Sequence, residues 1–242
     1  MDTNKNRYTM PGIISNAASS SISRKSFLKL AGISTAALGI GMSMNGCKKD
    51  SNILTPPTGS IDLGTGDTAV LNYAYLLEQL ESAFYLTVIA SVYPGATSDE
   101  VAVLTDISLH EQGHRDYLKS VIPSANRIAD DLTFNFSSID FTNRTSVLNA
   151  ARTFEDTGIK AYNGIGYFIA TSDYLAHIGK IVSVEARHSA VIRELISPGS
   201  TSFAGDDIVD PASGAENSTP PSQIMPALAS YFTITFTYTA LP

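Results

Sequence analysis

The chain has 242 residues, of which 16 are Lys or Arg and 23 are Asp or Glu, so its formal net charge is −7. This length allows one sizeable hydrophobic core. The single cysteine excludes both an internal disulfide framework and a cysteine-rich metal site. The acidic balance argues against nucleic acid or an anionic lipid surface as the partner.

Residues 1–46 have the pattern of an export signal. Arg24 and Lys25 open a short basic segment, and a mildly apolar run rich in Gly, Ala and Ser follows over residues 30–44. The run is short and only mildly apolar for a stable membrane span. The pattern resembles a bacterial twin-arginine signal, with Lys25 in place of the second arginine, joined to a lipoprotein cleavage site before Cys47.

This resemblance implies that Cys47 becomes the lipidated first residue of an exported, membrane-anchored lipoprotein of the cell envelope, either periplasmic or on the outer-membrane surface. An uncleaved N-terminal anchor helix is the alternative. In both cases the body of the protein lies outside the cytoplasm. Residues 47–66 are rich in Pro, Gly, Ser and Thr, which predicts a flexible tether.

Residues 67–198 are predicted to form an all-α bundle of four helices. The expected helices run from Asp67 or Thr68 to about Val92, from Ser98 to the residue before Pro123, from Thr142 or Asn143 to about Ala170, and from the break at residues 171–173 to Ile196. Short breaks within the first and the second pair predict two antiparallel hairpins. The link between the pairs, about residues 122–141, is long enough to cross the full length of the bundle.

Two of these helices carry a Glu-x-x-His pair at the centre of an apolar stripe. Glu111 and His114 lie in the second helix, and Glu185 and His188 lie in the fourth, with apolar residues three or four positions apart on both sides. A buried carboxylate and a buried imidazole are costly unless something compensates them. Two Glu-x-x-His helices are half of the ligand set of a carboxylate-bridged dinuclear metal site in a four-helix bundle.

The first and third helices supply carboxylates at the same level. Glu78 and Glu81 lie 17 and 14 residues before Gly95, and Glu155 lies 17 residues before Ser172. Antiparallel hairpins therefore bring acidic residues of the first and third helices to the height of both Glu-x-x-His pairs.

These segments resemble the ferritin-like superfamily of di-iron carboxylate proteins, and most closely its exported branch that includes desiccation-related proteins. The resemblance rests on residues 77–85, on residues 154–158 with Ala161 and Tyr162, and on residues 184–188. It implies a ferritin-like four-helix bundle with a long crossover between its second and third helices. It also implies a site for two iron ions, with manganese as the alternative, whose ligands are Glu78 or Glu81, Glu111, His114, Glu155, Glu185 and His188.

The ligand from the first helix is open between two residues. Glu78 precedes Tyr85 by seven positions, as Glu155 precedes Tyr162, and this spacing favours Glu78. Glu81 precedes Glu111 by 30 positions, as Glu155 precedes Glu185, and this spacing favours Glu81. We prefer Glu78, with Glu81 as a further ligand or a supporting residue.

Oxygen-rich sites with histidine suit Fe(II) and Mn(II). The expected activity is oxidation of Fe(II), or reduction of O2 or peroxide. Tyr85 and Tyr162 are candidates for an electron relay, and core packing is the simpler role for both. The alternative function is a non-enzymatic envelope protein of stress or desiccation protection, whose metal is structural or absent.

The remaining histidines and the C-terminal segment carry weaker signals. His110 lies one residue off the apolar stripe and is expected at the surface or its boundary, and His177 is expected to be exposed or to support a ligand. Residues 199–242 are expected to be irregular except for a strand over 231–239, where polar and apolar residues alternate. The expected partner of this strand is the crossover near residues 133–136.

Overall fold

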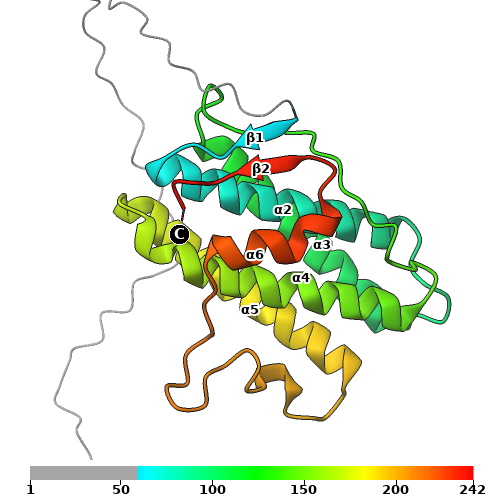
Figure 1. The fold of residues 1–242 in the computed structure, drawn as a ribbon. Helices are drawn as coiled ribbons and strands as arrows, with labels where there is room; N and C mark the ends of the chain where they lie inside the picture. The colour runs from blue at the N-terminus through cyan, green and yellow to red at the C-terminus, as the bar shows by residue number, and fades with distance from the viewer. Residues whose placement is uncertain (1–58, 242) are drawn as a thin grey trace, which may run out of the picture. The chain divides into compact units, whose positions relative to one another are not determined.

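The computed structural model describes residues 59–241 (Figure 1), so the export signal, Cys47 and most of the expected tether lie outside the described residues. The elements in chain order are β1 (Ser60–Asp62), α2 (Gly66–Ala90), α3 (Ser98–Val121), α4 (Arg144–Ile165), η1 (Gly166–Phe168), α5 (Ser172–Ile196), η2 (Ser202–Ala204), α6 (Pro221–Leu228), η3 (Ala229–Tyr231) and β2 (Thr235–Thr237). Within residues 59–241, no helix is both long enough and apolar enough to cross a membrane.

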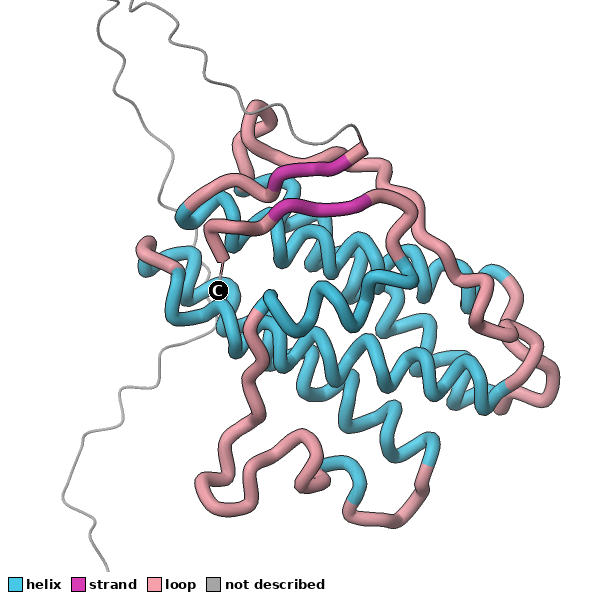
Figure 2. Tube along the Cα trace, viewed as in Figure 1, coloured by secondary structure: helices cyan, strands magenta, loops and turns pink. Residues whose placement is uncertain are grey.

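The four long helices form the two predicted hairpins, α2 with α3 and α4 with α5 (Figures 1 and 2). The first turn contains Gly95, whose φ of 82° suits a residue without a side chain. A reciprocal capping box then starts α3, in which the Thr97 hydroxyl accepts from the Glu100 N–H and the Glu100 carboxylate accepts from the Thr97 N–H. This is the start that the sequence predicts.

Two predicted helix ends differ from those observed. Asp67 does not cap α2, because Thr65 occupies the N-cap position. The Asp67 carboxylate instead accepts hydrogen bonds from the backbone N–H groups of Ala170 and Thr171, which ties the α4–α5 turn to the start of α2. The helix expected to reach Ala170 ends at Ile165 and tightens into η1. Glycine is unfavourable in a helix, and two glycines, at 164 and 166, flank this end.

The crossover from Ile122 to Asn143 lies along α2. Three α2 side chains on one helical face hold it: Asn72 binds the backbone of Asn126 and Ile128, the Tyr75 hydroxyl donates to Asp130, and Gln79 binds the backbone of Ala129 and Leu132. Because α3, α4 and the crossover all cover α2, this helix is buried on nearly every side. Its buried surface is therefore much wider than the single apolar stripe of an amphipathic helix.

The C-terminal segment is more ordered than the sequence indicates. Residues 221–228, expected to be irregular, form α6, and the strand expected over 231–239 is limited to β2. Its partner is also different, because β2 pairs in parallel with β1, whose residues fall inside the expected tether. The predicted partner, the crossover, contacts the segment just before β2, through an isolated bridge between Phe134 and Phe232 and through hydrogen bonds of Thr133 and Asn135 with residues 230–233.

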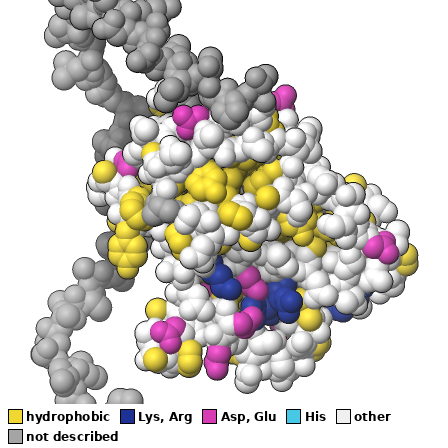
Figure 3. All heavy atoms as spheres, viewed as in Figure 1, with side chains coloured by type: hydrophobic (Ala, Val, Ile, Leu, Met, Phe, Trp, Pro, Cys, Tyr) yellow, Lys and Arg dark blue, Asp and Glu magenta, His cyan; other side chains and the backbone are white. Residues whose placement is uncertain are grey.

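Two sets of contacts fasten this segment to the bundle. Arg193 of α5 is 4% exposed and pairs with Asp156 of α4 at 2.6 Å and with Asp207 of the tail at 2.7 Å. Apolar side chains also gather over β2 and α6 (Figure 3), where a surface pocket is lined by residues that include Met225 and Phe236. Ile224, Met225 and Leu228 of α6 are thereby buried in the same apolar core as the four long helices.

Candidate metal centre

All four bundle helices contribute side chains to one buried cluster. Its members are Glu78 and Glu81 from α2, Glu111 and His114 from α3, Glu155 from α4, and Glu185 and His188 from α5. The five glutamates are at most 2% exposed and His188 is 3% exposed. The side chain of His114 is 13% exposed. The structure thus places every ligand candidate in the interior of the bundle.

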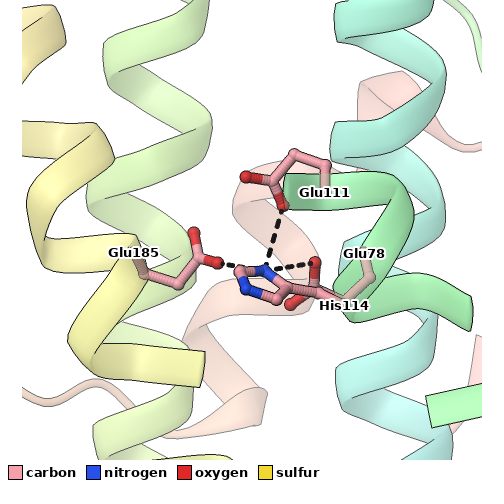
Figure 4. Close-up of side chains that lie close together, drawn as sticks. All are labelled: Glu78, Glu111, His114 and Glu185. Carbon is pink, nitrogen blue, oxygen red and sulfur yellow. Dashed lines mark ion pairs between the residues drawn. The ribbon is translucent and has the colours of Figure 1, made fainter. Parts of the chain in front are cut away.

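Four of these side chains form a first group of potential ligands, drawn in Figure 4. His114 Nδ1 lies 2.7 Å from Glu185 Oε1 and 3.6 Å from both Glu78 Oε2 and Glu111 Oε2. The imidazole sits between Glu185 on one side and the other two carboxylates on the other (Figure 4). Each residue of the group offers one atom within 4.8 Å of those of the other three.

A second group has the same composition. It consists of Glu111, Glu155, Glu185 and His188, and again each residue offers an atom within 4.8 Å of the others. His188 Nδ1 lies 2.7 Å from Glu111 Oε1, 3.5 Å from Glu155 Oε2 and 3.7 Å from Glu185 Oε2. Glu111 and Glu185 belong to both groups, so the cluster has the form of two adjacent cation sites that share two carboxylates.

Two tyrosines connect the hairpins at the edges of the cluster. The Tyr85 hydroxyl of α2 donates to Glu155 Oε1 of α4 at 2.5 Å, and the Tyr162 hydroxyl of α4 donates to Glu78 Oε1 of α2. Burial and the neighbouring glutamates raise the pKa of both tyrosines well above the usual value, so both hydroxyls keep their protons. Each tyrosine occupies one oxygen of a glutamate and leaves the other oxygen of that glutamate facing the cluster.

Most polar atoms of the cluster have no hydrogen-bond partner. This observation allows the fit of a metal to be judged. Both oxygens of Glu111 and of Glu185, one oxygen of Glu78, Glu81 and Glu155, and Nδ1 of both histidines are buried without a hydrogen-bond partner. The short nitrogen–oxygen distances therefore lack the direction that a hydrogen bond requires. Desolvating a carboxylate costs several kcal/mol, which ligation of cations compensates. The residues present fit such cations.

Burial in the cluster shifts the pKa values of the carboxyl groups. Burial raises the pKa of Glu81 and of Glu111 well above the usual value, and it raises that of Glu155 to about 7. Burial acts in the same direction on Glu185, but the two histidines outweigh it and lower the pKa of this residue to about 2.

The pKa values of the two imidazoles are raised as well, but by the neighbouring carboxylates and against the effect of burial. Burial disfavours the charged form of His114, but the three carboxylates around it raise its pKa to about 12. The pKa of His188 is raised for the same reason. Without metal, the protein therefore balances these carboxylates with protons on the histidines and on part of the glutamates. Metal ions would displace those protons.

A surface pocket between α3 and α5 reaches the cluster from the histidine side. It has a volume of about 360 Å³ and is lined by residues that include Gly113, His114, Arg187 and His188. His110 also lines it and lies at the surface, as the sequence predicts, but its Nδ1 is 2.9 Å from His188 Nε2. The outer nitrogen of His188 is thus held while Nδ1 faces the carboxylates. His177 lies elsewhere, stacked on Tyr117.

Gly158 is a further residue of the cluster that the sequence pattern does not reveal. It follows Glu155 by one helical turn, and a Cβ atom at this position would lie 3.0 Å from Glu81 Oε1. The absence of a side chain makes room for the Glu81 carboxylate. Glu81 is therefore part of the buried cluster, although it belongs to neither four-residue ligand group.

The comparison with known protein families agrees with this architecture. The chain matches the family described as a ferritin-like domain over residues 66–198. Among curated proteins, none matches this chain. The family match does not separate the branches within the superfamily, so the relation to desiccation-related proteins stays a prediction. Because the match covers more than half of the chain, and because the bundle carries a candidate carboxylate and histidine metal cluster, the protein belongs to the ferritin-like domain family.

Proposed function

We propose that this protein is an exported oxidoreductase that holds two iron ions in the buried cluster. The observation that carries the proposal is the pair of four-residue ligand groups that share Glu111 and Glu185. Glu78 and His114 would complete one site, and Glu155 and His188 would complete the other. Two Fe(II) ions held together would supply two electrons to O2 or peroxide, and manganese is the alternative metal.

The protein's own residues prepare this chemistry. Four carboxylates offset the four positive charges of two divalent ions, and the two neutral imidazoles complete the ligand set. Tyr85 and Tyr162 fix the orientation of Glu155 and Glu78 through their hydroxyl groups. The pocket between α3 and α5 gives small solutes access to the histidine side of an otherwise buried site.

The location of the activity is a separate part of the proposal. The signal-like residues 1–46 and Cys47 support export and lipid anchoring. We infer that the domain works at the cell envelope, where it would meet Fe(II), O2 or peroxide from outside the cytoplasm. Globomycin-sensitive processing and labelling of Cys47 with a fatty acid in the native host would test this part, and a Cys47→Ala chain that is processed and labelled like the wild type would contradict it.

Metal content and redox activity together test the main proposal. The purified chain is loaded with Fe(II) without oxygen, its metal is counted by elemental analysis, and consumption of O2 or hydrogen peroxide is then followed. We expect about two ions per chain and rapid consumption. The variant that combines Glu111→Ala with Glu185→Ala should lose both, because it removes the shared ligands.

Asp116→Ala is the matched control, because this carboxylate also lies on α3 but its side chain is 62% exposed. It should retain the metal and the activity. A chain that binds two ions tightly but consumes neither oxidant would contradict the oxidoreductase and leave a protective protein with a structural metal. A chain that binds no ions would contradict both.

A further inference from the structure

The two histidines of the cluster differ in how their outer nitrogens are held. His188 Nε2 lies 2.9 Å from Nδ1 of His110, a residue of α3 one helical turn before His114. The angle between the ring planes of His110 and His188 is 8°, and the ring centroids are 5.2 Å apart. Atoms of rings packed face to face stay about 3.5 Å apart, so this closer contact places the two imidazoles edge to edge. The contact is therefore a hydrogen bond that lies close to both ring planes.

The position of the cluster fixes the direction of this hydrogen bond. The other ring nitrogen of His188, Nδ1, lies 2.7 Å from Glu111 Oε1 and is the atom that a metal ion would use. A neutral imidazole has one hydrogen, so a ligating Nδ1 leaves that hydrogen on Nε2. His188 Nε2–H therefore donates to His110 Nδ1. In the metal-free chain, where His188 carries a hydrogen on each nitrogen, the direction is the same.

His114 lacks this support among residues 59–241. Its Nδ1 lies 2.7 Å from Glu185 Oε1 and faces the carboxylates (Figure 4), and no described residue forms a hydrogen bond with its Nε2. The side chain of His114 is 13% exposed, whereas that of His188 is 4% exposed. Both histidines line the pocket between α3 and α5, so the outer nitrogen of His114 is left to solvent.

The carboxylates do not produce this difference. The two ligand groups are the His114 group, with Glu78, Glu111 and Glu185, and the His188 group, with Glu111, Glu155 and Glu185. In the His188 group, Tyr85 donates to Glu155. In the His114 group, Tyr162 donates to Glu78 in the same way. The support of the imidazole is therefore what distinguishes the two groups, and such support is worth about 10–100-fold in metal affinity.

From this difference we propose that His110 is a positioning residue for His188, and that it makes the His188 group the tighter of the two ion sites. The His114 group, whose imidazole lacks such a partner and is the more exposed, holds the ion that exchanges with solution. This division of roles rests on the proposed two-ion site and adds to it. The ion in the His188 group is the retained cofactor, and Fe(II) that is itself oxidised as substrate enters and leaves at the His114 group.

The hydrogen bond is tested first in the metal-free full chain, by ¹H–¹⁵N NMR of the imidazole groups. The Nε2–H group of His188 should exchange slowly with water in the wild type. His110→Asn should retain this slow exchange, because the asparagine Oδ1 stands near the place of the histidine Nδ1 and also accepts a hydrogen bond. His110→Leu should abolish it. His110 is exposed, so neither replacement empties a core position.

Competition titration of Co(II) with a chromophoric chelator then measures the two affinities. We expect them to differ by at least about tenfold in the wild type, and His110→Leu should weaken the tighter one by about 10–100-fold. His110→Asn should restore it. In a chain that also carries His114→Ala, the same loss should appear at the remaining site, whereas in a His188→Ala chain His110→Leu should have no effect. Leu109→Ala is the matched control, because Leu109 lines the same pocket and is 58% exposed. It should leave both affinities unchanged.

Three results would overturn the proposal. These are slow exchange of the His188 Nε2–H group that survives His110→Leu, equal affinities of the two sites in the wild type, or equal weakening of both sites by His110→Leu. Equal affinities in a chain that holds two ions would contradict only the division of roles. A chain that shows the expected NMR result but binds no ion would contradict the proposed function, and the division of roles with it.

Discussion

At the scale of single residues, the two hairpins supply almost equivalent groups to the cluster. Tyr85 and Tyr162 each follow a cluster glutamate by seven positions, and each donates to the glutamate of the other hairpin. The equivalence ends one turn later, where α2 has Glu81 and α4 has Gly158. Five carboxylates therefore share a space in which the two ligand groups use only four.

The choice between Glu78 and Glu81 shows what sequence spacing can and cannot predict. The seven-residue spacing to tyrosine indicates Glu78, and the structure places Glu78 in the first ligand group. The 30-residue offset that favours Glu81 assumes hairpins of equal length. The first hairpin is longer, because α2 extends two residues further past Glu78 than α4 does past Glu155, and its link to the next helix is one residue longer.

Separate alanine substitutions of Glu78 and Glu81 should have different effects on metal binding. Glu78→Ala removes a member of the first ligand group and should weaken binding of one ion by at least the 10–100-fold that loss of a supporting residue costs. Glu81→Ala should keep two ions per chain. Competition titration with a chromophoric chelator measures both affinities.

Glu81 also affects the stability of the metal-free chain. Glu81→Gln removes a buried acid whose pKa is strongly raised, so the metal-free chain should unfold at a higher urea concentration than the wild type. Loss of one bound ion in Glu81→Ala, with both ions retained in Glu78→Ala, would reverse the assignment made here.

At the scale of elements, local sequence patterns predict the helices, but they do not predict which segments pack over them. The capping box spans only Thr97 to Glu100, and each Glu-x-x-His pair lies in a regularly spaced stripe within one helix, so local patterns predict α3 and α5 well. The pairing of β1 with β2 joins Ser60 to Thr235, across almost the whole described chain. Two three-residue strands carry too little pattern to specify such a partner.

The burial of α2 can be predicted from the sequence, whereas the segment that packs over it cannot. Away from the face that carries Glu78, α2 has apolar side chains at Val70, Leu76 and Leu80, which are all at most 1% exposed. A helix that is apolar on all sides is a buried helix. The sequence therefore contained the signal that α2 is enclosed, but the identity of the enclosing crossover depends on polar contacts between residues 50 or more positions apart.

Asp130 anchors this crossover and gives it a pH dependence. The hydrogen bonds from Arg127 hold the pKa of Asp130 well below its usual range, with Lys119 and Tyr75 acting in the same direction against burial. A depressed pKa in the folded state stabilises the protein above the unfolded-state pKa, near 4. This contribution is lost as the pH falls through the lower pKa of the folded state.

Replacing Asp130 by Asn should therefore destabilise the protein more at pH 7 than at pH 3. The expected loss at pH 7 is about 1 kcal/mol, because the side chain is 35% exposed and solvent screens the ion pairs. Urea unfolding at both pH values measures it. Asp131→Asn is the control, since Asp131 is exposed and forms no ion pair within residues 59–241. An equal effect of Asp130→Asn at both pH values would contradict the assigned role.

At the scale of the whole described domain, the cluster connects the two hairpins through potential metal ligands and hydrogen bonds. Each ligand group takes residues from both hairpins, and both tyrosines cross between them. In the metal-free chain the hairpins converge on carboxylates that are buried with unused hydrogen-bonding capacity. Metal ions that bind only the folded arrangement would remove this penalty and join the four helices.

Metal loading should therefore raise the stability of the entire bundle. At a free metal concentration about 100 times the dissociation constant, each site contributes about 2.7 kcal/mol to the free energy of unfolding. We expect Mn(II), which avoids redox chemistry during the measurement, to raise the unfolding midpoint of the wild-type chain, and a chelator to reverse the shift. The combined Glu111→Ala and Glu185→Ala variant should show no shift, because both groups lose their shared oxygens.

His177→Ala is the control for nonspecific binding of metal to histidine, since His177 is stacked on Tyr117 outside the cluster. It should respond to Mn(II) as the wild type does, whereas His114→Ala should lose the contribution of one site. Equal shifts in His114→Ala and in the wild type would show that the stabilising ions bind elsewhere. Circular dichroism and tyrosine fluorescence should report the same midpoint in each case, because ions shared by both hairpins make the bundle unfold as one unit.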